Sequence, residues 1–279
     1  MTRAEFDAWS PHSVANFAAQ QVAAGLLPPG EATTMAWRAF GELLPQGLAT
    51  PQHHFWTVHE TDGPAGPVGH LWLRVGPGEN GTEGYVYDVE LEPAARGRGL
   101  GRATMLAAEG AARGLGATAL RLNVFGHNPI AIRLYDGVGF AVTGATMSRT
   151  LDDLPPSSGP DVELRELSRE RRADVAGALA DDLLWTAYVR DEQVGQVWLA
   201  VQDRSDGRHA LCRRLEVDPT RRGRGYAEAI GLAALRAGRE HGVRTVSAEI
   251  GPDPAARRLC DRLGLVLTAQ TMVKPLPSG

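Results

Sequence analysis

The chain repeats itself once, and this repeat constrains the possible folds more than any other feature. Four blocks recur in the same order: residues 68–73 recur as 194–199, 91–93 as 217–219, 96–101 as 222–227 and 143–147 as 268–272. Chance could produce one block rich in arginine and glycine, but an ordered set of four indicates duplication of a whole unit. The 279 residues are therefore expected to form two domains of one architecture, each long enough to bury its own core.

Composition marks the boundary between the copies. Residues 152–160 form a Pro/Ser/Gly cluster without the periodicity of a helix or a strand, which is typical of a linker. We therefore predict a first domain at 1–151, a linker at 152–161 and a second domain at 162–279. The first copy has an additional N-terminal segment, which is predicted to form two helices at about 11–24 and 30–44.

The hydropathy pattern of each copy predicts a mixed α/β domain, α+β with a mixed sheet. In the first copy we expect strands at 55–58, 68–75, 84–91, 119–124 and 140–150, and helices at 102–113 and 129–137. Asn128 is expected to cap the second of these helices, with Pro129 in its first turn. The strand at 84–91 has a two-residue period, which places Val86, Asp88 and Glu90 on one face and Tyr85, Tyr87, Val89 and Leu91 on the other.

The composition and net charge disfavour several classes of function. A formal net charge of −4 and a pI near 6.1 disfavour a nucleic-acid partner, which normally requires a basic excess. The two cysteines are too few for a disulfide framework, and neither they nor the histidines have the spacing of metal ligands, so we expect no metal and a reducing cytoplasmic location. No apolar run approaches the length of a membrane span, and we expect no targeting segment.

The segment at 96–101 (RGRGLG) lies between a predicted strand and an Ala-rich helix, where it is expected to bind an anion. Glycines let successive backbone N–H groups converge, and a helix N-terminus adds partial positive charge. A phosphate-bearing ligand is therefore expected. A Walker A loop is excluded because no Lys-Ser or Lys-Thr follows, and the dinucleotide fingerprint fails because Arg102 stands where its last glycine belongs. A basic glycine-rich surface turn is the alternative.

The same segment resembles the pyrophosphate loop of the GNAT superfamily of N-acetyltransferases, Arg/Gln-x-x-Gly-x-Gly/Ala, through Arg96, Gly99 and Gly101. In the second copy Arg222, Gly225 and Ala227 match the pattern. The segments 91–93, 128–135 (NPIAIRLY) and 139–140 flank it as they do in that superfamily. The resemblance covers about 55–151 well and 185–275 less well, and it implies two acyl-CoA N-acyltransferase domains in tandem.

The resemblance implies an enzyme that transfers an acetyl group from acetyl-CoA to a primary amine of a small molecule or peptide, by direct attack in a ternary complex. Backbone groups of Val89 and Leu91 would hold the pantetheine arm, and the amides of 97–102 the pyrophosphate. The residues implied to contact the coenzyme are Val89, Leu91, Arg96, Gly97, Arg98, Gly99, Leu100, Gly101, Arg102 and Asn128. Possible counterparts in the second copy are Val217, Arg222, Gly223, Arg224, Gly225, Tyr226 and Ala227.

Three side chains of the first copy are candidates for the chemistry. The resemblance places Tyr135 as the general acid for the coenzyme A thiolate, and a half-buried structural aromatic is the alternative. Glu90 is the candidate general base, and Asp88 is expected to orient the substrate. Both carboxylates could instead attract a cationic amine while a water chain removes the proton.

The second copy departs from the family pattern at these positions. Cys260 corresponds to Tyr135, Asp253 to Asn128 and Arg214 to Asp88, whereas Glu216 matches Glu90. We therefore expect catalysis in the first copy and a degenerate second copy, with Cys260 as a buried small residue rather than a thiol acid. The extra N-terminal helices are the candidate for acceptor binding.

Two other functions and two assembly states stay open. A non-catalytic acyl-CoA-binding or regulatory protein is the contrasting hypothesis, and an RNA-binding module is disfavoured by the net charge. The copies are expected to form either a monomer with an intramolecular pseudo-dimer or a homodimer.

Overall fold

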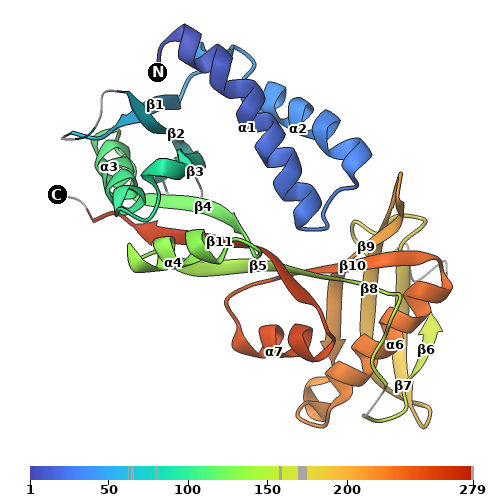
Figure 1. Cartoon of the computed structure of the whole chain (residues 1–279). Coiled ribbons are helices and arrows are strands. Elements are labelled where there is room, and N and C mark those ends of the chain that lie inside the picture. The colour runs from blue at the N-terminus through green and yellow to red at the C-terminus, as the bar shows by residue number, and fades with distance from the viewer. Residues whose placement is uncertain (62, 64–65, 79–80, 157–158, 169–174, 278–279) are drawn as a thin grey trace. The chain divides into compact units, whose positions relative to one another are not determined.

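A computed structural model describes residues 1–61, 63, 66–78, 81–156, 159–168 and 175–277 (Figure 1). The chain divides into two compact units. Unit 1 comprises Met1–Thr143 together with Ala269–Gly279, and unit 2 comprises Gly144–Thr268. Most of the predicted linker is among the described residues, but Ser157 and Ser158 lie outside them.

Unit 1 begins with the helices α1 (Arg3–Ala23) and α2 (Pro29–Leu43), coloured blue in Figure 1. The helix α1 starts earlier than predicted, because Thr2 and Glu5 form a capping box that satisfies the first turn. Pro11 therefore lies inside the helix instead of starting it. Burial of Phe6 and Trp9 offsets the hydrogen bond that proline removes, since both rings are more than nine-tenths buried.

The sheet of unit 1 has the strand order β1-β2-β3-β4-β11. Its elements are β1 (His53–His59), β2 (Pro67–Gly78), β3 (Gly81–Leu91), β4 (Ala119–Phe125) and β11 (Val266–Pro275), with α3 (Leu100–Gly114) after β3 and α4 (Pro129–Gly137) after β4. The β3–β4 pair is parallel and the other pairs are antiparallel. This mixed sheet with helices confirms the predicted fold class.

Helices cover both faces of this sheet. Leu71 and Leu73 pack in one core with α3, whereas Trp72, between them, packs in a second core with Phe6 and Trp9 of α1. Because alternate residues of a strand point to opposite faces, α1 and α3 lie on opposite sides of β2.

A β-bulge in β3 overturns the predicted division of its faces. The register shifts between Trp72, which pairs with Asp88, and Leu73, which pairs with Val86, so Tyr87 is the extra residue. Val86 and Val89 consequently pack on the α3 side, whereas Tyr87 packs on the α1 side. The period of two fails because one inserted residue reverses the alternation from that point onward. Asp88 and Glu90 still share a face, now with Tyr87.

Unit 2 repeats this plan. Its strand order is β5-β10-β9-β8-β7-β6, from β5 (Ala141–Thr150), β6 (Glu163–Glu166), β7 (Leu183–Val189), β8 (Glu192–Arg204), β9 (Gly207–Val217) and β10 (Val243–Ile250), with helices α6 (Tyr226–Glu240) and α7 (Pro254–Arg262). The strand β9 has the equivalent bulge, because Trp198 pairs with Arg214 and Leu199 with Cys212. The repeated blocks therefore occupy equivalent places in equivalent sheets.

The last strand of each copy belongs to the unit built by the other copy. The first copy's last strand, β5, was expected to close the first domain, but residues 145–150 pair with β10 of unit 2. The last strand of the second copy, β11, pairs through 269–275 with β4 of unit 1. Met147 and Met272 end the same repeated block, and each is fully buried in the core of the exchanged unit.

An ion pair with a buried carboxylate anchors β11 in unit 1. Lys274 Nζ lies 2.6 Å from Glu109 Oε1 of α3 and donates to the Val138 carbonyl, also at 2.6 Å. We expect Lys274→Met to lower the free energy of unfolding by about 3 kcal/mol, because the buried Glu109 carboxylate is left unpaired. Thermal or urea unfolding measures the loss. As a matched control, Arg3→Met breaks the exposed pair with Asp7 and should change stability by less than about 1 kcal/mol; equal losses would contradict the assignment.

Candidate functional site

A cavity of about 220 Å³ lies in unit 1 where β3 and β4 separate. Their pairing ends at Val86 and Leu122, and the residues that follow on both strands line the cavity. Side chains of α1, α2 and α4 complete the walls. Two contacts hold α1 against the end of β4 and the loop that follows: Phe17 meets Phe125 with ring centroids 6.3 Å apart, and His127 Nε2 lies 2.6 Å from Gln20 Oε1.

The glycine-rich turn at 97–101 joins β3 to α3. Gly97 and Gly99 have φ angles of 73° and 83°, in the left-handed region that favours glycine, and Gly99 is the N-cap of α3. A Cβ atom on either glycine would meet no heavy atom within 4 Å, so open space faces the turn. Gly99 supplies no side-chain hydrogen bond to the first turn of α3, which leaves that helix N-terminus suited to an anion.

The arginines of this segment are held by groups of unit 1. Arg96 Nε donates to the Leu91 carbonyl at 2.9 Å, Arg98 pairs with Glu60 at 2.6 Å, and Arg102 donates to the Gly137 carbonyl at 2.6 Å. These contacts orient the turn relative to the end of β3 and to α4.

Tyr135 lies in the cavity wall, as part of α4. Its side chain is only 8% exposed. Burial, helped by the negative charge of Asp88, raises the pKa of Tyr135 to about 12. The phenol therefore keeps its proton at neutral pH and remains available as a proton donor. Asn128 caps α4 as predicted, accepting from Ala131 N at 3.0 Å, and it also lines the cavity.

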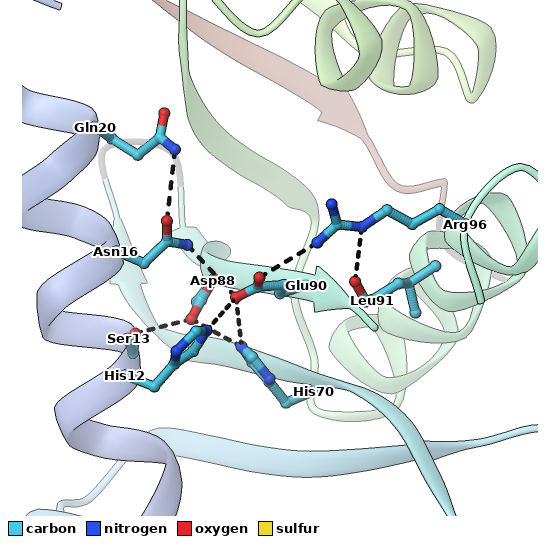
Figure 2. Close-up of polar contacts among 9 residues, drawn as sticks. All are labelled: His12, Ser13, Asn16, Gln20, His70, Asp88, Glu90, Leu91 and Arg96. Carbon is cyan, nitrogen blue, oxygen red and sulfur yellow. Dashed lines mark hydrogen bonds and ion pairs between the residues drawn. The ribbon is translucent and has the colours of Figure 1, made fainter. Parts of the chain in front are cut away.

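Figure 2 shows that two carboxylates of β3, Asp88 and Glu90, face α1. Asp88 lines the cavity and accepts a hydrogen bond from Ser13 Oγ at 2.8 Å. Glu90 lines a neighbouring recess of about 550 Å³, where it contacts His12, Asn16 and Arg96. The cavity thus contains Tyr135 and Asp88, while Glu90 lies in the adjoining recess.

Four polar residues form a cluster with Asp88 and Glu90 through direct contacts but were not singled out from the sequence: His12, Ser13, Asn16 and His70. His70 is the direct cross-strand partner of Glu90, and its Nε2 atom lies 3.1 Å from Asp88 Oδ2. The other three lie on the first helix, whose start was misplaced. The only sequence signal was the position of His70 in a repeated block.

His53 packs against Phe55, Trp72 and Tyr87, and it is expected to make the stability of unit 1 sensitive to acid. His53 Nδ1 accepts from Trp72 Nε1 at 2.9 Å, and burial, with Arg74 and His54, lowers the pKa of His53 from 6.5 to about 4. Because the unfolded chain binds this proton more readily, we expect the stability contribution of His53 to be lost as pH falls from about 6.5 to about 4. Melting temperatures at pH 7.5 and pH 5 should differ more for the wild type than for His53→Gln; equal differences would contradict this.

Unit 2 has a corresponding cavity of about 210 Å³ where β9 and β10 separate, but its lining is different. Cys260 takes the place of Tyr135 and is buried, and burial raises the pKa of its thiol. Arg214 replaces Asp88 and lies 3.8 Å from Glu216. The glycine turn is preserved, with Gly223 and Gly225 at φ angles of 77° and 79°.

In the part of the chain that the structure describes, no helix is long and apolar enough to cross a membrane. Within those residues, no group of three or more His, Cys, Asp or Glu side chains is arranged to hold a metal ion.

Comparison with known families gives two matches along the chain. The sequence model of the Acetyltransferase (GNAT) family matches residues 24–140 and again residues 148–265. The two matches follow the two copies of the repeat and together span most of the chain.

Individual relatives with similar sequences or structures are also acetyltransferases by name. The uncharacterized N-acetyltransferase YycN of Bacillus subtilis (strain 168) is 35% identical over 153 residues, which are 54% of this chain and 96% of that protein. A mycothiol acetyltransferase of Nocardioides sp. is 38% identical over 91 residues, 30% of this chain and 31% of that protein. A solved GCN5-related N-acetyltransferase from Sphaerobacter thermophilus shares the fold, with a TM-score of 0.53, 21% identity and coverage of 96% of this chain and 93% of that one.

Proposed function

Because the chain belongs to the GNAT acetyltransferase family, we propose that unit 1 transfers an acetyl group from acetyl-CoA to a primary amine. One observation carries the proposal: Tyr135 and Asp88 line one cavity, and a short 3-10 helix (Pro93–Ala95) connects the strand that carries Asp88 to the open glycine turn. The cavity thus has a proton donor and a proton acceptor beside a turn suited to phosphate.

The residues of unit 1 fit acetyl-CoA. The amides of 97–102 would hold its pyrophosphate, because the turn is open and the N-terminus of α3 has no side-chain cap. Val89 would hold the pantetheine arm through its backbone, since it lies beyond the point where β3 and β4 cease to pair. Acetyl-CoA supplies the activated thioester, and these residues place it at the cavity.

The acid–base roles follow from the surroundings of each group. The amine must lose a proton before it can attack, and Asp88 and Glu90 are the carboxylates on the face that meets it. Tyr135 gives its proton to the departing thiolate, because burial keeps the phenol protonated. Positioning of the two reactants in the cavity contributes further to the rate.

The lining of the cavity supports an acceptor with an apolar body. On the α2 side it consists of Ala36, Ala39, Phe40 and Leu43, whereas Asp88 is the carboxylate that lines the same space. An amine attached to a compact apolar small molecule or peptide end satisfies both features, because the charge meets Asp88 and the body meets α2.

Turnover tests the proposal. Release of free thiol should follow when acetyl-CoA is mixed with a panel of primary amines, and apolar amines should have the highest kcat/KM. Tight binding of coenzyme A with no turnover on any amine would contradict the proposal and support a non-catalytic acyl-CoA-binding protein. Cys260 and Arg214 favour that second function for unit 2, and calorimetry with acetyl-CoA should give a stoichiometry of one or two according to whether unit 2 also binds.

A further inference from the structure

His70 lies at the wall between the cavity and the recess of unit 1. Asp88 lines the cavity, whereas His70, Glu90 and His12 line the recess. The ring of His70 packs against Trp9 with centroids 5.6 Å apart, which holds it in place from the α1 side. Titratable groups therefore connect the largely buried Asp88 carboxylate to the exposed side chain of His12.

The distances form a continuous series from the cavity to the surface (Figure 2). His70 Nε2 lies 3.1 Å from Asp88 Oδ2 and 3.9 Å from Glu90 Oε2. Glu90 Oε2 is in turn 3.2 Å from His12 Nε2, and the His12 side chain is 63% exposed. The 3.9 Å step exceeds hydrogen-bonding distance, so a small tilt of the ring or a bridging water must complete it.

We infer that Asp88 receives the proton of the acceptor amine and that His70 passes a proton on to Glu90, from which it leaves through His12. This inference rests on the proposed acetyl transfer and deepens it. His70 acts as a positioning and relay residue, because it contacts Asp88 and not the reacting atoms. Ser13 orients Asp88 through its hydrogen bond to Oδ2.

The proton balance of the reaction requires such an exit. An ammonium group that becomes an amide loses two protons: one replaces the proton that Tyr135 gives to the coenzyme A thiolate, and one must leave. The N–H bond breaks as an O–H bond forms on Asp88. His70 Nε2, unprotonated while Nδ1 carries the ring proton, accepts the proton from Asp88 and then releases it to Glu90 Oε2, so Asp88 and His70 return to their starting states. Because the Asp88 side chain is only 17% exposed, the released proton needs a path to solvent.

The second copy supports this assignment independently. Gln196 stands at the position of His70 and donates to Glu216 Oε2 at 2.7 Å, and Arg214 stands at the position of Asp88. Neither an amide nor a guanidinium changes its protonation state near neutral pH, so neither can relay a proton. The copy that lacks a tyrosine equivalent thus also lacks the relay, although it preserves the strand register.

Other charged groups face the recess and must be considered in any pH profile. They are the Met1 amine, Glu5, Glu92 and Arg96, in addition to His12 and Glu90. Arg96 Nη2 is 3.5 Å from Glu90 Oε1, on the side away from His70. Of these groups only Glu90 and His12 continue the series of short distances that begins at Asp88.

The test uses the full chain with the best amine of the panel. We expect His70→Ala to lower kcat by at least about 10-fold while KM for acetyl-CoA is unchanged, because the relay affects proton removal and not coenzyme binding. Added imidazole should restore part of kcat in a saturable manner by entering from the recess. His70→Gln keeps a polar side chain that the equivalent position of the second copy already accepts, so it should fold, show the same loss and resist rescue.

His54→Ala is the matched control, because this ring stacks on Trp56 of β1 outside the cluster, and kcat should not change. Unaltered kcat in both His70 variants would overturn the relay, as would a loss that imidazole fails to reverse in His70→Ala. If the wild type turns over no amine, both the proposed function and the relay are wrong. If the wild type turns over an amine and the His70 variants do so equally well, only the relay is wrong.

Discussion

Replacing Tyr135 with phenylalanine should lower kcat by about 10³-fold, within the range of a lost general acid. The ring stays, so packing around α4 is kept and KM for acetyl-CoA should change little. The loss should persist throughout the accessible pH range, because the pKa of Tyr135 is raised to about 12 and the wild-type phenol does not ionise near neutrality. Steady-state kinetics from pH 6 to pH 9 measures this effect.

Tyr85→Phe is the matched control for this substitution. Tyr85 is also a partly buried tyrosine of unit 1 with a raised pKa, but it lies on β3 before the bulge. Its replacement should leave kcat within about two-fold of the wild type, as expected of a group that takes no part in the reaction. Similar losses in the two variants would show that the phenol of Tyr135 has no special role.

Replacing Gly99 with aspartate should raise KM for acetyl-CoA by about 100-fold, which corresponds to about 2.7 kcal/mol. The new carboxylate would stand at the turn that is proposed to hold the pyrophosphate, where like charges repel. Aspartate tolerates the left-handed backbone better than most residues, and its Cβ would meet no atom within 4 Å. Because the effect is electrostatic, kcat at saturating acetyl-CoA should stay near the wild-type value.

Two further variants test whether the negative charge at the turn of unit 1 causes the rise in KM. Gly99→Asn has nearly the same shape without the charge and should raise KM by much less. Gly225→Asp places the same charge at the equivalent turn of unit 2, where φ is 79°, and should leave the kinetics unchanged if unit 1 alone is catalytic. An equal rise of KM in Gly225→Asp would contradict the assignment of acyl transfer to unit 1.

Much of the fold could be predicted because local signals and the repeat agreed. The helix α4 has the predicted bounds, since Asn128 and Pro129 form a strong start signal. The start of α1 was missed because Pro11 resembles a first-turn residue, although Thr2 and Glu5 form an earlier and complete cap. The bulge at Tyr87 left no trace in the pattern of apolar residues, because aromatic side chains suit either face.

Only the parts of the site that lie in contiguous sequence motifs could be predicted. The glycine turn and Tyr135 are carried by contiguous motifs, and the structure places Tyr135 in a cavity wall and the turn at the start of α3. The position of His70 between two carboxylates depends instead on the register of β2 against β3, and Ser13 reaches Asp88 from a helix 75 residues away in sequence. Such partners need the tertiary structure, because neither spacing nor composition distinguishes them from other polar residues of the chain.

The exchanged last strands bear on how a duplicated gene can diverge. The fold of unit 1 requires Met272 and Lys274, which the second copy encodes, and unit 2 requires Met147 from the first. Selection for a folded unit 1 therefore also acts on the second copy's sequence, although that copy has Cys260 and Arg214 where the first has Tyr135 and Asp88. Deleting the second copy would therefore also change unit 1: a truncation after residue 151 would remove β11 from the unit that it was meant to isolate.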